Sequence, residues 1–141
     1  MVAPLPLGRQ HQLHGVQPVL PVPEVAAAAD WFVRVLGFEV DFGIGAPPVH
    51  ARVKLGDRSW GDPIYIHLLL QHGPIQPCGQ TRLHVGHDID GLHHHVLAQG
   101  ATVLQPPVDQ PWGLREFVLQ APGGHQLVLG AERASVAPPD R

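Results

Sequence analysis

The sequence predicts an α+β fold built from two βαβββ units, and three observations carry that prediction. Two helix-like segments, 25–36 and 89–99, each end at a glycine in the position that closes an α-helix. The runs that begin at those glycines, Gly37-Phe-Glu-Val and Gly100-Ala-Thr-Val, lie 63 residues apart in equivalent places. The regular pattern ends in a hairpin, with β-rich runs on both sides of Ala121-Pro-Gly-Gly.

The first unit spans residues 15–73 and opens with a strand at 16–22. Pro23 and Glu24 then start an alanine-rich helix, and alanine is the residue that stabilises helices most. Turn-forming residues fill 56–63, between the last two strands of the unit. The three strands expected after the helix are 38–42, 49–55 and 63–70.

The second unit, 79–131, repeats this order. Asp88 can cap its helix, because a carboxylate accepts hydrogen bonds from the first free amides. Its strands are expected at 81–85, 101–104, 115–120 and 126–129. Both units form one domain, 15–131, and the aperiodic segments 1–14 and 132–141 are predicted to be flexible tails.

The composition excludes several classes of protein. Of the 141 residues, 44% are hydrophobic and 15% charged, which excludes a disordered chain and suits one globular domain. A net charge of −3 provides no basic surface for phosphates, so nucleic acid is not an expected partner. We expect no membrane span and no secretory signal. Cys78 is alone, which favours a reducing, cytoplasmic setting.

The hairpin carries the most specific motif, Trp112-Gly-Leu-Arg-Glu-Phe followed by Pro122-Gly-Gly. It resembles the last hairpin of bleomycin-resistance proteins, in the glyoxalase/bleomycin resistance/dioxygenase (vicinal oxygen chelate, VOC) superfamily. Ala121 and His125 stand where that family usually has Asp and Asn, so the turn has lost its side-chain acceptor. The resemblance covers about 16–130 and implies curved mixed sheets around a cavity.

Metal-dependent members of the family take ligands from the first and fourth strands of each unit. In this sequence those positions fall on Gln17 and His67 in the first unit, which are competent donors. In the second they fall on Thr81, or Gln80 in a shifted register, and on Val128, which cannot ligate. Two donors do not hold a first-row metal well. The resemblance therefore implies no metal and no other cofactor.

The run His93-His94-His95 is not a metal site either, because consecutive helical residues point about 100° apart. We interpret it as a solvated helix face.

The candidate ligand-binding residues are of two kinds. Tyr65, His67 and Leu69 alternate along one half-polar strand face, while the tryptophans lie in Gly/Pro-rich loops that could expose an indole. The whole set is Gln17, Trp60, Tyr65, His67, Leu69, Trp112 and Glu116. For His67 an interior hydrogen-bonded role is an equal alternative, and for the loop tryptophans burial at a subunit contact. Arg115 and Glu116 must point to opposite faces of their strand, and either could reach the cavity.

The resemblance favours a non-metal protein that sequesters a planar aromatic or amphipathic molecule, in the manner of antibiotic resistance, in a cavity at a homodimer interface. An enzyme is the less favoured reading. It would be a metal-dependent lyase, isomerase or dioxygenase of the same superfamily, and fold alone does not separate the two. A dimeric module without a small ligand is the third hypothesis.

Overall fold

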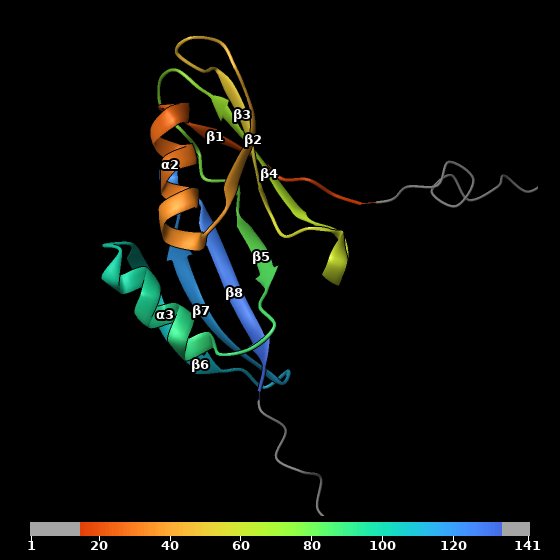
Figure 1. The fold of residues 1–141 in the computed structure, drawn as a ribbon. Helices are drawn as coiled ribbons and strands as arrows, with labels where there is room; N and C mark the ends of the chain where they lie inside the picture. The colour runs from red at the N-terminus through yellow and green to blue at the C-terminus, as the bar shows by residue number, and fades with distance from the viewer. Residues whose placement is uncertain (1–14, 134–141) are drawn as a thin grey trace, which may run out of the picture.

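The computed structural model describes residues 15–133, so the expected tail 1–14 and most of the expected tail 132–141 lie outside the described residues. Glu132, expected in that tail, ends the last strand. Two four-stranded sheets lie one above the other in Figure 1, each with a single helix, and both helices lie on the same side. No helix among the described residues is long and apolar enough to cross a membrane. The predicted α+β fold of two βαβββ units is confirmed.

The first unit forms a sheet with the strand order β1-β4-β3-β2. β1 runs parallel to β4, and the other neighbours are antiparallel. The elements are β1 (Val19–Val22), α2 (Val25–Leu36), β2 (Glu39–Ile44), β3 (His50–Leu55), the 3-10 turn η1 (Arg58–Trp60) and β4 (Ile64–Leu70).

The second unit repeats this topology, with the order β5-β8-β7-β6 and β5 parallel to β8. Its elements are β5 (Gln80–His84), α3 (Ile89–Ala98), β6 (Thr102–Asp109), β7 (Leu114–Gln120), the 3-10 turn η2 (Pro122–Gly124) and β8 (Gln126–Glu132). The predicted strand 101–104 was too short, because β6 continues through Pro106 and Pro107. Prolines fit there because β6 is an edge strand with irregular pairing, where a missing N–H leaves no central ladder broken.

The helix boundaries follow from the predicted caps. The Glu24 carboxylate accepts hydrogen bonds from the N–H of Ala26 (3.1 Å) and Ala27 (2.7 Å). Gly37 ends α2 in the left-handed region, with φ at 75°. Asp88 accepts from the N–H of Gly91 at 3.0 Å and begins α3. The two carboxylates pair amides that the start of a helix leaves free.

Each helix covers one face of its sheet. Phe32 of α2 is fully buried, and Trp31 beside it packs edge-on at 5.0 Å, partly buried against the core. In the second unit His93 of α3 packs edge-on against Phe117 at 5.4 Å, so one of the three helical histidines leaves the solvated face predicted for them. The opposite face of each sheet is left open.

His125 joins the two units. Its ring is 1% exposed, Nδ1 accepts the N–H of Cys78 at 3.1 Å, and Nε2 lies 2.6 Å from the carbonyl oxygen of Pro21 in β1. Because Nδ1 accepts, the proton sits on Nε2 and donates to Pro21. The imidazole therefore replaces the lost turn acceptor with a link between β1, the inter-unit connection and β8.

Replacing His125 with Ala should lower the free energy of unfolding by ~1–3 kcal/mol, because two part-buried hydrogen bonds from a buried side chain are lost. His125→Asn, which keeps one donor and one acceptor, should lose less. Urea unfolding measures both. His94→Ala, on the exposed side of α3, is the control and should change stability by under about 0.5 kcal/mol. Equal losses in the two alanine variants would show that the link does not stabilise the fold.

Candidate functional site

The open face of the first sheet is the side turned away from α2. The register sets Val19, His67, Arg52 and Phe42 side by side across the four strands, so their side chains project from the same surface. Aromatic, basic and apolar groups are mixed on it. The open face includes Val19, Phe42, Ile44, His50, Arg52, Lys54, Tyr65, His67 and Leu69.

A chain of three polar side chains crosses this face. His67 Nε2 lies 2.6 Å from Gln17 Oε1, and His67 Nδ1 lies 2.9 Å from His50 Nε2. Gln17 Oε1 only accepts, so His67 donates from Nε2 and accepts from His50 at Nδ1. These two contacts fix the tautomer of His67 and the orientation of both rings. Both ring nitrogens of His67 are thus hydrogen-bonded, one of them to Gln17.

The pKa of His67 is lowered from 6.5, first by burial and then by the nearby charges of His50 and Arg52. A protonated ring would also have no acceptor at Nδ1. His67 therefore presents a neutral imidazole at pH 7, as a hydrogen-bonding group and not as a cation.

Arg52 ties the aromatic part of the face together. Its guanidinium lies 4.4 Å from the ring centre of Tyr65 and 5.1 Å from that of Phe42. The same group donates to Asp41, with Nε 2.8 Å from Oδ2. Cation–π contact with two rings and an ion pair hold the guanidinium in one place, so the rings of Tyr65 and Phe42 are held as well.

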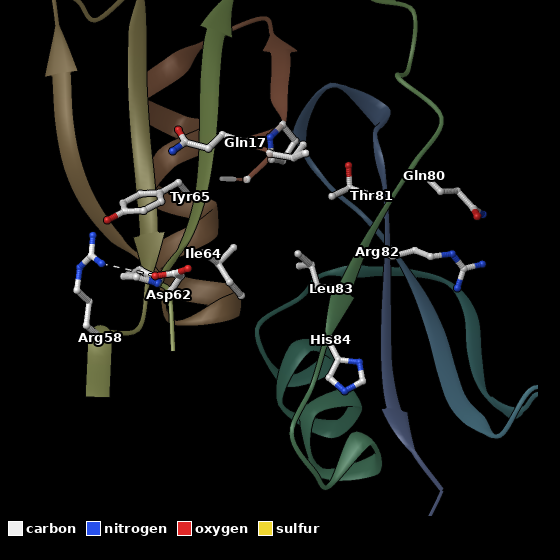
Figure 2. Close-up of a pocket in the computed structure, with 14 residues that line it drawn as sticks. Gln17, Arg58, Asp62, Ile64, Tyr65, Gln80, Thr81, Arg82, Leu83 and His84 are labelled. Carbon is white, nitrogen blue, oxygen red and sulfur yellow. Dashed lines mark ion pairs between the residues drawn. The ribbon is translucent and has the colours of Figure 1, made fainter. Parts of the chain in front are cut away.

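A cleft of about 1280 Å³ separates the edges of the two sheets. One wall is formed by residues 15–18 and the segment 62–65, and the other by β5. Figure 2 shows Gln17 and Tyr65 on the first wall, so the cleft is continuous with the open face. Arg58 also lines it and pairs with Asp62 at 3.6 Å.

Beyond β5 the second sheet carries a second ion pair. Glu116 on β7 reaches across Gly130 on β8, and its Oε2 lies 2.5 Å from Arg82 Nη1 on β5. The Glu116 side chain is 4% exposed and that of Arg82 56%. Because neighbouring Phe117 faces α3, Glu116 faces the open side. Arg115 points the other way, to Asp90 and Asp109.

Residues 12–129 match the family model of the Glyoxalase/Bleomycin resistance protein/Dioxygenase superfamily. The chain belongs to this superfamily. A comparison with curated proteins found no match.

Solved structures of the superfamily fold are similar over most of the chain. TioX from Micromonospora sp. ML1 is 27% identical with a TM-score of 0.66, covering 84% of this chain and 100% of that one. The bleomycin-binding protein of bleomycin-producing Streptomyces verticillus, in complex with copper(II)-bleomycin, is also 27% identical with a TM-score of 0.66, covering 86% and 98%. A glyoxalase-related enzyme from Clostridium phytofermentans has a TM-score of 0.69 at 20% identity, covering 86% and 96%, which shows the fold alone.

The structure shows where the positions that carry ligands in metal-dependent members of the superfamily lie in this chain. Gln17 and His67 are in contact, as two ligands would be. Thr81 pairs with Leu127 on the side of the helix, whereas Gln80 pairs with Gln126 on the open side. Val128 is buried directly opposite Arg82. Within residues 15–133 no three His, Cys, Asp or Glu side chains converge.

The remaining predicted site residues are spread over the molecule. Leu69 is 45% exposed on the open face, and Trp112 is 58% exposed in the loop between β6 and β7. Trp60 ends η1, two residues from Arg58 of the cleft wall. The structure thus brings Gln17, Tyr65, His67 and Leu69 onto one surface and leaves Trp112 on another element.

Sequence reasoning missed His50, Arg52 and Arg82. In β3 the residues His50, Arg52 and Lys54 alternate with Ala51 and Val53, which is the pattern of a strand with one polar face. That alternation was the available signal for His50 and Arg52.

His67 should titrate below 6.5 when its imidazole signals are followed by NMR from pH 8 to 4, because burial and two basic neighbours disfavour its charge. His67 therefore binds a proton more readily in the unfolded chain than in the folded protein. This site's contribution to stability is therefore complete above about pH 6.5 and is lost as the pH falls through the lower folded pKa. Arg52→Gln should raise the pKa of His67. A titration at or above 6.5 in the wild type would contradict the interpretation.

Proposed function

We propose that this protein sequesters a planar aromatic or amphipathic small molecule, without a metal, in a cavity completed by a second copy of the chain. The observation that carries the proposal is the open face beside the cleft. Fixed aromatic rings, a neutral hydrogen-bonding histidine and exposed aliphatic groups share one surface there. Such a mixture of apolar area with a few oriented polar groups is typical of small-molecule sites.

Each predicted residue has a part in this proposal. Tyr65 offers a π-surface, Leu69 apolar area, and the pair of Gln17 and His67 a polar contact of fixed geometry. Trp60 and Trp112 would close over the ligand from their loops, and Glu116 acts from the second sheet.

The similarity to the Streptomyces protein supports binding over catalysis. That protein is a bleomycin-binding protein seen with copper(II)-bleomycin, and it shares 27% of its residues with this chain over most of both lengths. A role in antibiotic resistance by sequestration is part of the proposal. The lone, exposed Cys78 suits the reducing cytoplasm in which we place the protein.

A homodimer follows from the apolar groups that the open face exposes. Val19, Ile44 and Leu69 are each close to half exposed on that side of the first sheet. A two-fold partner covers such a surface on both chains at once and turns two open clefts into closed cavities.

The contact between Gln17 and His67 also favours a second candidate, a metal-dependent enzyme of the same superfamily. Both side chains can act as metal ligands, and His67 Nε2 lies 2.6 Å from Gln17 Oε1. Val128 and the cation of Arg82 opposite it argue against that candidate, because a guanidinium repels a divalent ion.

Titration with bleomycin-type glycopeptides and a panel of planar aromatics should quench tryptophan fluorescence saturably. Tyr65→Leu should weaken binding by about 2–10-fold, because an aromatic contact contributes ~0.5–1.5 kcal/mol. His67→Ala and Trp112→Ala should each weaken it as well, and His94→Ala on exposed α3 is the matched control. Affinities unchanged by all three site variants would place the ligand elsewhere.

Native mass spectrometry should show a species of twice the 15.2 kDa chain mass, without stoichiometric Zn, Ni, Fe or Mn. The mass reports the dimer and the metal content in one measurement. Near one metal per chain that His67→Ala removes would favour the enzyme. A single 15.2 kDa species at micromolar concentration would contradict the shared cavity.

A further inference from the structure

We propose that the ligand carries an anionic group, a carboxylate or a similar planar oxyanion, and that Arg82 is the residue that binds it. The inference rests on the proposed binding function and adds the charge of the ligand. The charged contact would lie on the open side of the second sheet, on the other side of β5 from the cleft wall that carries Tyr65 (Figure 2).

The Arg82–Glu116 pair is asymmetric in its access to solvent. Glu116 is 4% exposed and Arg82 is 56% exposed, so an approaching molecule meets the guanidinium and not the carboxylate. In the other ion pair of the cleft both partners are exposed, Arg58 at 83% and Asp62 at 85%. Only the cationic end of the Arg82 pair is presented.

The backbone is shaped to hold Glu116 in place. A Cβ at position 130 would lie 3.1 Å from Glu116 Cγ and 3.2 Å from Oε2, which is closer than side chains normally pack. Glycine there lets the carboxylate lie flat over β8 and reach β5. Glu116 thus acts as a positioning residue that holds the Arg82 guanidinium in one orientation.

The guanidinium keeps donors for a ligand. A guanidinium has five N–H donors. Within residues 15–133, Arg82 makes one hydrogen bond with them, from Nη1 to Glu116. The remaining N–H groups of the guanidinium match a carboxylate or phosphate, which binds Arg through two parallel hydrogen bonds. The Arg115 guanidinium, by contrast, already donates hydrogen bonds to the carboxylates of Asp90 and Asp109.

The carboxylates that would attract a cationic ligand are already engaged. Glu116 is buried against Arg82, Asp109 pairs with Arg115, and Asp62 pairs with Arg58. Among the described residues that line the cleft, two are arginines, Arg58 and Arg82, and one is an aspartate, Asp62. An anion therefore gains a partner at this site, whereas a cation would have to displace one.

The first experiment tests the anion site without assuming any ligand. The Arg Nε–Hε signals are followed by ¹H–¹⁵N NMR in the full-length protein as benzoate, and separately inorganic phosphate, is added. We expect a saturable shift at Arg82 and little at Arg58, the matched arginine of the same cleft. A flat response at Arg82, or equal shifts at both residues, would overturn the proposal.

The second experiment compares three probes of one shape, 2-naphthoate, 2-naphthamide and 2-naphthylmethylamine, by calorimetry. The carboxylate should bind about tenfold more tightly than the amide, the difference that a charge-assisted fork provides. The double variant Arg82→Gln/Glu116→Gln leaves no unpaired buried charge and should abolish that preference. Arg58→Gln should retain the preference.

The outcomes separate this inference from the proposed function. Binding of all three probes without preference, or with preference for the amine, would refute an anionic ligand and leave sequestration intact. A saturable NMR shift at Arg82 with no naphthyl binding would support the anion site and count against the aromatic sequestering role.

Discussion

Each four-stranded sheet in this protein has one helix, and the rest of the molecule follows from that constraint. A sheet has two faces, so one is buried under α2 or α3 and the other remains available. The strands alternate accordingly, with residues such as Ile66 and Leu68 buried and His67 between them on the open face. The site is therefore built from positions that the core does not need.

Local chemistry explains why much of the fold was predictable. The caps at Glu24, Gly37 and Asp88 act within three residues of the helix ends they define, so a sequence pattern contains them completely. The length of β6 was missed because Pro106 and Pro107 are acceptable only where no strand pairs on the far side. Which strand is an edge depends on the whole sheet.

The site was predictable only in part, for the same reason. The grouping of Gln17, Tyr65, His67 and Leu69 on one surface could be predicted, because alternation within a strand and family positions indicate a face. The pairing of Arg82 with Glu116 was not predicted, because the two residues are 34 positions apart and come together only when β8 lies between their strands. His125 was recognised as a departure from the family motif, but the partners that make use of it come from β1 and the inter-unit connection.

The imidazole at position 125 also restricts which residue position 123 can hold. A Cβ on residue 123 would lie 2.9 Å from His125 Nε2 and 2.7 Å from the Pro21 carbonyl oxygen, in a backbone conformation (φ 86°) that already favours glycine. A side chain there would meet both ends of the hydrogen bond that joins the two units. Glycine at 123 thus lets the turn before β8 approach β1 closely enough for that bond to form.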